Sequence, residues 1–353
     1  MKNKSLMKLL TAAAPALFLL IPATASAQES GGVAPLFDGH AVIDVRIQAP
    51  LKTLARKRPD EEYLDARFSY SETDGSERTF DLKLRTRGRY RRQRSTCPFP
   101  PVRLNFPKKA VEGTLLDGQD KLKLVTHCNT RRDNYEQLVL REYLTYRILQ
   151  TLTEKSFGAR LLRINWVDTE GDDPFVRYGF VIEDDDDIGP RTGLQKLKSN
   201  GLSYKEVDAA HTNLISVFQF LIGNTDYSLV RGPAGSDCCH NSVPFKAVGP
   251  VFPIPYDFDF SGLVDAPYAE PNPQFRIRSV TKRVYRGRCF NNERLPDTLA
   301  YFKDRKAEIY GLVDEVAALD DKNRKAVIDY LDSFYEIAED PGKAEKELIR
   351  ECS

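Results

Sequence analysis

The chain has 353 residues, of which 29% are charged and 41% hydrophobic, and its formal net charge is +1. This near-neutral balance gives no argument for a nucleic-acid partner. The length is sufficient to bury a substantial core, as one large domain or two lobes.

The first 27 residues have the pattern of a secretory signal peptide. The segment opens with three lysines, continues with an apolar stretch over residues 9–21 and ends in the A-x-A site Ala25-Ser26-Ala27. We therefore predict cleavage after Ala27 and a secreted or periplasmic protein. No other long apolar run follows, so we expect no stable membrane anchor after cleavage, an uncleaved anchor being the minor alternative.

Six cysteines follow this segment, at positions 97, 128, 238, 239, 289 and 352. In an exported chain they predict disulfides, and the lack of a C-x-x-C motif in the sequence disfavours a zinc ribbon. We expect Cys238 and Cys239 to pair with distant cysteines, because a bridge across one peptide bond is strained. The full pairing stays open at this point.

The first half of the chain has the pattern of a mainly antiparallel sheet with one inserted helix. Apolar alternation and turn signals predict strands over residues 42–48, 66–71, 79–85, 102–106, 121–126, 161–168 and 178–183. The turn signal at residues 73–76 joins the second strand to the third as a hairpin. Apolar side chains at helical spacing predict one long helix over Asn134–Leu152.

The second half is mostly helical. One apolar stripe stops at Gly223, and two closing helices carry stripes over residues 302–316 and 327–338. The acidic run Asp184–Asp187 predicts a solvated turn, with calcium binding as the minor alternative. These patterns divide the chain into a β-rich part over residues 28–188 and a mainly helical part over residues 189–353.

Two acids alternate with aromatic residues in the stretch Pro253–Gly262. On a strand, this alternation places Asp257 and Asp259 on one face and Phe258 and Phe260 on the other. Two neighbouring carboxylates repel each other unless a proton or a cation neutralises them, which suits a divalent metal with oxygen ligands. A strand end with two solvated acids is the alternative.

Further polar residues come in the order that phosphoryl transfer uses. Asp226 follows the helix of the second half, and His240-Asn241 comes before Asp257 and Asp259. The reaction needs a carboxylate that orients the attacking hydroxyl, an amide and a carboxylate that hold the metal, and a cation for the phosphates. The structural alternatives are a turn cap at Asp226 and a packed neighbour at His240.

Several short motifs between residues 85 and 262 occur together in this order. They are Arg85-Thr86-Arg87-Gly88, the strand Val102–Phe106, the strand and helix segments Leu122–Val125 and Leu140–Leu144, the strand Gly179–Glu183, Asn224-x-Asp226, Asn241 and Tyr256–Asp259. The set resembles the spore-coat H (CotH) family of atypical, secreted protein-kinase-like proteins.

The resemblance implies an α+β, two-lobed protein-kinase-like fold. Its N-lobe would be an antiparallel sheet with one long helix, and its mainly helical C-lobe would carry the catalytic and metal loops. The resemblance also implies that ATP and Mg²⁺ bind between the lobes. The γ-phosphate would pass to a Ser or Thr of an unidentified protein substrate.

The resemblance also implies roles for single residues in the reaction. Asp226 would be the catalytic base. Asn241 and Asp257 would be metal ligands, and Asp259 would be a second ligand or a structural acid.

Around the nucleotide, the resemblance implies that Lys123 meets the phosphates and that Glu142 pairs with it, with Glu136 as the competing acid. Gly88 would let the backbone approach the phosphates. Arg103 and Glu183, from the strand after the glycine turn and the strand before the hinge, complete the predicted nucleotide-binding set.

Two other functions stay open. One is a catalytically silent, disulfide-stapled binding or structural module of the cell envelope, because ATP is scarce outside the cytoplasm. The other is a carboxylate-based hydrolase that uses Asp226 with Asp257 or Asp259. The single Trp166 gives little support to a carbohydrate enzyme, which should add aromatic platforms.

Overall fold

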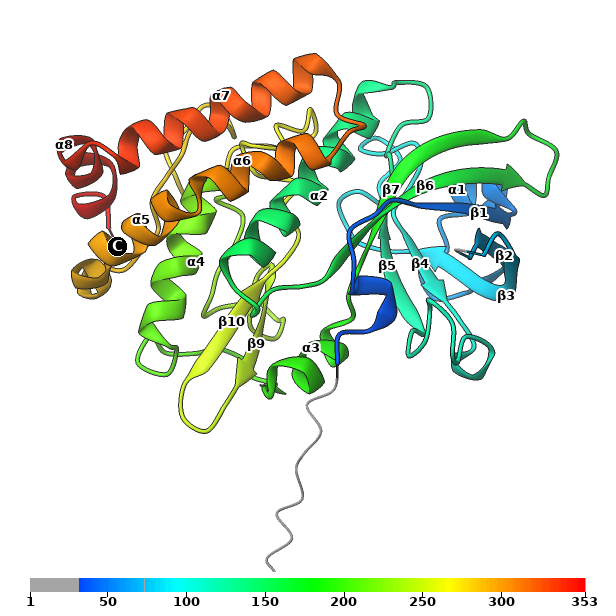
Figure 1. Ribbon diagram of the computed structural model, residues 1–353, viewed down its shortest axis with the longest axis horizontal. Coiled ribbons are helices and arrows are strands. Elements are labelled where there is room, and N and C mark those ends of the chain that lie inside the picture. Colours follow the sequence, from blue (N-terminus) through cyan, green and yellow to red (C-terminus); the bar gives the residue numbers. More distant parts are fainter. Residues whose placement is uncertain (1–31, 73, 353) are drawn as a thin grey trace, which may run out of the picture.

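Seven strands of the chain close into a barrel. The computed structural model describes residues 32–72 and 74–352, so the predicted signal peptide over residues 1–27 lies outside the described residues. In barrel order the strands are β1 (Ile43–Ala49), β2 (Leu64–Ser71), β3 (Glu77–Thr86), β4 (Val102–Asn105), β5 (Lys121–Val125), β7 (Phe175–Ile182) and β6 (Ala159–Asp168) (Figure 1). The seven strands predicted from the sequence are confirmed, with ends shifted by a few residues.

The barrel closes where β1 and β6 run parallel. Ile43 pairs with Leu162 and Ala49 with Asp168, whereas the other six neighbouring pairs are antiparallel. The prediction of a two-lobed protein-kinase-like fold with an antiparallel-sheet N-lobe is therefore wrong. Apolar alternation identifies strands, but it does not show that two strands far apart in the sequence meet and close the sheet.

The barrel closes because alternate side chains of these strands share one interior. Val45 and Ile47 of β1 are buried beside Ile164 and Trp166 of β6 in the same apolar cluster. Burial of such side chains stabilises by about 1.5–3 kcal/mol each. The polar residues between them on β1 lie on the outer face.

Eight α-helices occur among the described residues. They are α1 (Leu51–Lys57), α2 (Asn134–Leu152), α3 (Asp185–Thr192), α4 (Ala209–Ile222), α5 (Leu295–Asp304), α6 (Lys306–Glu315), α7 (Asp321–Ala338) and α8 (Pro341–Ala344). The predicted bounds of α2 are confirmed, and α4 ends as predicted at Gly223, whose φ is 66°. The first of the two predicted closing helices is instead two helices, α5 and α6, interrupted at Arg305.

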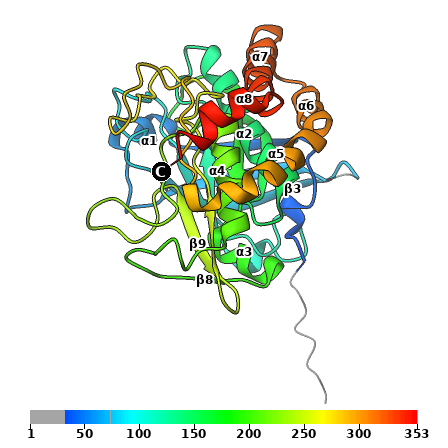
Figure 2. The ribbon, with the colours of Figure 1, turned by 90° about the vertical axis from the view of Figure 1, so that its left-hand side faces the viewer.

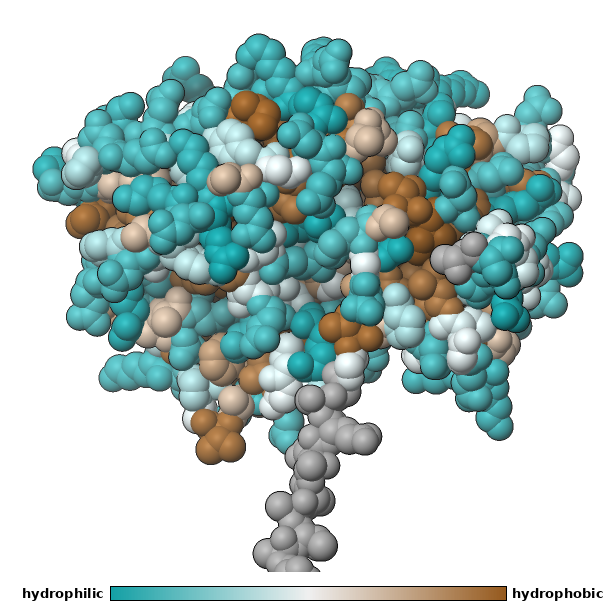
Figure 3. Space-filling model, viewed as in Figure 1, coloured by the Kyte–Doolittle hydropathy of each residue, from teal (hydrophilic) through white to brown (hydrophobic). Residues whose placement is uncertain are grey.

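Helix α2 joins the barrel to the helical part of the molecule. It packs against β6 and β7 on one side and against α6 on the other (Figure 1). Val125, Leu161 and Phe180 of the barrel strands belong to the same apolar core as the helices α4 to α7. The face shown in Figure 3 is mostly hydrophilic, with its largest hydrophobic area right of centre, over the barrel strands.

A second, small sheet lies beside α3 and α4 (Figure 2). Its strands are β8 (Gln195–Lys196), β9 (Ser242–Lys246) and β10 (Val251–Pro255). Because β10 ends at Pro255, Asp257 and Asp259 follow the strand and do not alternate along it, so that prediction is wrong. Asp257 has a φ of 63°, which turns the chain out of the extended conformation.

Three disulfides join the six cysteines. Cys97 pairs with Cys128 and Cys289 with Cys352, so Cys238 and Cys239 pair with each other. The prediction that Cys238 and Cys239 pair outward is wrong, because the other four cysteines already lie close together in pairs. Disulfides fit an extracellular protein. Among the described residues, no helix has the length and apolar character needed to cross a membrane.

Candidate functional site

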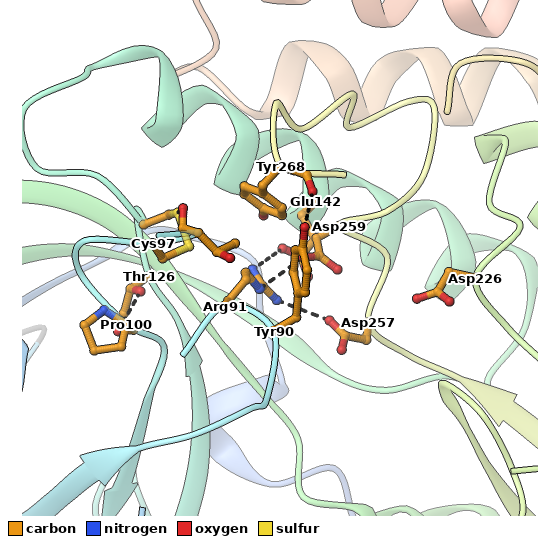
Figure 4. Close-up of polar contacts among 12 residues, drawn as sticks. Tyr90, Arg91, Cys97, Pro100, Thr126, Glu142, Asp226, Asp257, Asp259 and Tyr268 are labelled. Carbon is orange, nitrogen blue, oxygen red and sulfur yellow. Dashed lines mark hydrogen bonds and ion pairs between the residues drawn. A yellow bond between two sulfur atoms is a disulfide. The ribbon is translucent and has the colours of Figure 1, made fainter. Parts of the chain in front are cut away.

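Arg91 lies among three carboxylates (Figure 4). Its Nη1 is 3.2 Å from Oε2 of Glu142, its Nη2 is 3.2 Å from Oδ1 of Asp257, and its Nε is 3.1 Å from Oδ2 of Asp259. Arg91 comes from the loop after β3, Glu142 from α2, and the two aspartates from the loop after β10. We call these four residues the Arg91 cluster. It connects the barrel, α2 and the small sheet.

Two acids of the Arg91 cluster, Glu142 and Asp259, are buried and have raised pKa values. The side chains of Glu142 and Asp259 are only 2% and 7% exposed. Burial raises the pKa of Glu142, Arg91 opposes this rise, and Asp257 adds to it. The pKa of Asp259 lies well above its usual value for the same reasons, burial first. Glu142 and Asp259 therefore hold their charge poorly, although Arg91 opposes the rise of both pKa values and Arg87 opposes that of Glu142, and a further cation would relieve them.

The guanidinium itself stays charged. Burial alone disfavours the charged form of Arg91, but Asp259, Glu142, Tyr268 and Asp257 together raise its pKa well above the usual value. One oxygen of the cluster, Oε1 of Glu142, is buried and has no hydrogen-bond partner among the described residues. Such an atom costs about 1–3 kcal/mol unless something binds it.

Asp226 lies in the loop after α4 and is oriented by two neighbours. Nε2 of His240 is 2.7 Å from its Oδ1, and Nδ2 of Asn241 donates to its Oδ2 at 3.0 Å and to its carbonyl oxygen at 2.7 Å. Its backbone N–H donates to Oδ1 of Asn224 at 2.8 Å. Its carboxylate is therefore held in one orientation.

The carboxylate of Asp226 is directed toward the Arg91 cluster (Figure 4). The charge of Asp226 contributes to the raised pKa of Asp259, after the effects of burial, Arg91, Asp257 and Glu142. The structure therefore brings Asp226, Asn241 and the two later aspartates into one region, although they come from separate loops.

Two residues of this region have left-handed backbone conformations. Asn241 has a φ of 49° and Asp257 a φ of 63°. Asn and Asp tolerate this region better than other residues, but each still costs free energy. Such strain is concentrated at functional sites, so it supports the choice of this region as the candidate site.

A row of basic side chains crosses three neighbouring barrel strands. The strand register places Arg85 opposite Arg103 and Arg103 opposite Lys123. All three are half-buried on the outer face, whereas Leu104 and Leu122 point into the barrel. We call Arg85, Arg103 and Lys123 the basic row. It offers three cations on one side of the barrel.

Lys123 does not pair with Glu142. Its Nζ lies 3.2 Å from Oδ1 of Asp185 and 5.4 Å from the centre of the Tyr256 ring. Asp185 is in the first turn of α3, whose N-cap is Asp184. The predicted solvated turn at Asp184–Asp187 is therefore the beginning of a helix, because acids stabilise a helix N-terminus.

Glu183 and Gly88, two further residues of the predicted nucleotide-binding set, have contacts or backbone conformations that hold the local structure. Glu183 is 1% exposed and forms an ion pair with Arg191 at 2.8 Å, while it accepts the N–H of Gly158 at 2.7 Å. This arrangement ties the end of β7 to the segment before β6. Gly88 follows β3, its φ is 78°, and no atom lies close to where a side chain would be. The turn therefore needs glycine for its backbone conformation and not for lack of space.

The predictions from the sequence did not include the contacts of three residues in this region. Arg91 is one of many arginines in residues 85–94, and nothing in that run distinguishes it. His240 is adjacent to Asn241, which was a usable signal for its contact with Asp226. Asp185 belongs to an acidic run whose helical cap was not recognised.

Comparison of the sequence with protein-family models and with curated proteins found no match. The function is therefore inferred from the residues of the site.

Proposed function

We propose that this chain is an exported phosphotransferase that uses a divalent cation and ATP to phosphorylate Ser or Thr of a protein substrate. The main observation behind this proposal is that the carboxylate of Asp226, which is held in one orientation, is directed toward the three acids of the Arg91 cluster (Figure 4). The proposal keeps the CotH resemblance for the site residues only, and it does not depend on a kinase fold.

The donor atoms of the Arg91 cluster fit Mg²⁺. Carboxylate oxygens of Glu142, Asp257 and Asp259 lie within 4.8 Å of one another. Hard cations such as Mg²⁺ and Ca²⁺ prefer oxygen ligands, and the buried Oε1 of Glu142 lacks a partner among the described residues. In the proposal, these acids hold the cation together with Asn241. The cation would offset the negative charge of the phosphates.

The basic row supports a place for the phosphates. Arg103 and Lys123 are adjacent on the outer face of the barrel, and Arg103 also lies close enough to Arg87 to lower its pKa, although burial is the main cause. Arginine binds phosphate through two parallel hydrogen bonds, and lysine binds it as a compact charge.

Asp226 would act as the base that accepts the proton of the substrate hydroxyl. The hydroxyl oxygen of the substrate would bond to the γ-phosphorus while the bond from this phosphorus to the departing diphosphate breaks. The hydroxyl proton would pass to Asp226. The contacts from His240 and Asn241 keep this carboxylate in one orientation, and fixed orientation is a large part of such catalysis.

One observation favours a second candidate, the catalytically silent binding module. Arg91 contacts all three acids of the cluster and satisfies part of their charge without a metal. A buried ion pair of this kind also serves a purely structural purpose. The two candidates differ in whether Mg²⁺ and ATP bind and react.

Thermal unfolding with Mg²⁺, ATP and their mixture separates the candidates. The phosphotransferase should be stabilised by the mixture more than by either component, because ligand binding to the folded state raises the melting temperature. Asp257→Asn should remove this effect. Asp65→Asn, at a 96% exposed acid on the barrel, is the matched control and should retain it.

Transfer of ³²P from γ-labelled ATP then tests the reaction. Asp226→Asn should retain the stabilisation by Mg-ATP but lose transfer by at least 100-fold, which is the usual scale for a positioned base. Absence of any Mg-ATP effect in the wild-type chain would reject the phosphotransferase and leave the binding module.

A further inference from the structure

A hollow of about 900 Å³ is lined by residues of the helical part of the chain, and these lining residues do not belong to the Arg91 cluster. Residues 202–205 and 230–231, together with Arg288 and Phe290, line it. Leu202 and Val230 are buried at its base, and Phe290 is 58% exposed. An aromatic residue of this exposure beside a hollow is available to a ligand.

The walls of the hollow are positively charged. Lys205, Arg231 and Arg288 line it, and it has no acidic lining residue among the described part of the chain. Lys205 and Arg231 are exposed and have no ion pair with any described residue. Arg288 lies over the ring of Tyr204 at 4.2 Å, and this ring meets Phe290 edge-on at 6.3 Å.

The backbone connects this hollow to the candidate site. The N–H of His240 donates to the carbonyl of Arg231 at 3.0 Å, and the N–H of Ser228 donates to the carbonyl of His240 at 2.9 Å. His240 is the residue that contacts Asp226. A ligand bound at Arg231 would therefore be connected to the proposed base, Asp226, through His240.

We propose that the hollow docks an acidic peptide segment of the protein substrate, one that carries an aromatic or aliphatic side chain. The cations of the hollow would form ion pairs with the acidic residues of the peptide. Tyr204, Phe290 and the apolar base of the hollow would pack against its hydrophobic side chain. A saccharide fits less well, because the lining residues that the structure describes include no carboxylate or amide side chain to bind sugar hydroxyls. The role in substrate selection rests on the proposed function, whereas the binding itself does not.

Fluorescence anisotropy of a labelled peptide tests the docking. The probe is a ten-residue peptide of Asp and Glu around one Phe and one Ser, and the reference has Gln in place of each acid. The oxidised chain should bind the acidic peptide at least tenfold more tightly than the reference. The difference should shrink between 50 and 300 mM NaCl, because exposed charges are screened.

The double variant Lys205→Glu, Arg231→Glu should weaken binding of the acidic peptide at least tenfold. The matched control Arg132→Glu, Lys322→Glu reverses two other exposed cations and should leave it unchanged. Equal binding of the two peptides, or no effect of the double variant, overturns the proposal. Tighter binding of polygalacturonate than of the acidic peptide also overturns it.

The same peptide separates this proposal from the proposed function. Binding is measured without nucleotide, both in the wild-type chain and in Asp226→Asn, and both should bind equally. Phosphorylation of the Ser is then measured with Mg-ATP. Binding of the peptide without phosphorylation supports the docking site and contradicts the phosphotransferase. Phosphorylation that is unchanged in the Lys205→Glu, Arg231→Glu variant contradicts the docking site.

Discussion

The guanidinium of Arg91 lies 3.2 Å from the carboxylate of Glu142, and both side chains are almost fully buried. Removing one partner of a buried pair leaves an uncompensated charge, so Arg91→Met should lower the free energy of unfolding by about 3–5 kcal/mol. Urea unfolding measures this loss. Arg67→Met breaks an exposed pair with Asp81 and should cost about 0–1 kcal/mol.

A divalent cation should compensate for the loss of Arg91. Without this guanidinium, the three acids of the cluster have the oxygen ligands of a cation site, and Arg87 still acts on Glu142 and Asp257 as a second cation. We expect 5 mM Mg²⁺ or Ca²⁺ to raise the melting temperature of Arg91→Met more than that of the wild type or of Arg67→Met. An equal shift in all three would show that these acids do not bind the cation.

The titration of His240 should depend on Asp226. The pKa of His240 is raised, first by its hydrogen bond to Asp226, with burial opposing. Asp226→Asn should therefore lower it toward the usual value of about 6.5. The pair stabilises the fold fully below the unfolded pKa, and this contribution is lost as pH rises through the folded pKa.

NMR titration of the four histidines measures this change. The other histidines, His40, His127 and His211, are internal controls and should keep their pKa values in Asp226→Asn. An unchanged pKa at His240 would mean that the contact to Asp226 is absent in solution.

His211 should make the protein less stable in acid. Burial is the main cause that lowers its pKa to about 4, and its Nε2 is 2.9 Å from the carbonyl of Pro253. Because the unfolded chain binds the proton near pH 6.5, stability is complete above this pH and falls as pH decreases toward 4. Between pH 7.5 and pH 5 this residue alone should cost ~2 kcal/mol. Urea unfolding at both pH values of the wild type and of His211→Gln, which keeps an N–H donor, should differ by this amount.

The loop that carries Arg91 should depend on the Cys97–Cys128 disulfide. Arg58 also holds this loop, by donating to the carbonyls of Arg92, Cys97 and Pro98. The disulfide spans 31 residues, and its loss in Cys97→Ala, Cys128→Ala should cost roughly 3–4 kcal/mol. Hydrogen exchange of residues 87–97 should accelerate. Cys289→Ala, Cys352→Ala should be destabilised without that local effect.

Individual strands and helices were predictable because their patterns are local. The alternation in β1 and the helical spacing of α2 follow from which side chains become buried. Closure of the barrel was not predictable in this way, because each strand would have the same alternation in an open sheet. The break at Arg305 was also missed, since the apolar stripe continues through it.

For the candidate site, the order of residues in the sequence did not predict their contacts. Asn241 donates to the carboxylate of Asp226, and Asp257 lies in the loop after β10 and not on a strand. The partner of Glu142 was missed because a buried arginine has the same sequence signature as an exposed one. Which basic residue reaches an acid depends on loop conformation, and residue spacing does not encode this.

The parallel pairing of β1 with β6 also sets the order in which the chain completes its fold. β1 emerges early from the ribosome, but the barrel closes only when β6 and β7 are both present, which needs residues up to Ile182. Until then, both outer strands of the growing sheet present unpaired backbone groups, which invite association with other chains. A fragment that stops before β6 should therefore aggregate, whereas one that includes β6 and β7 should have no open sheet edge in its barrel.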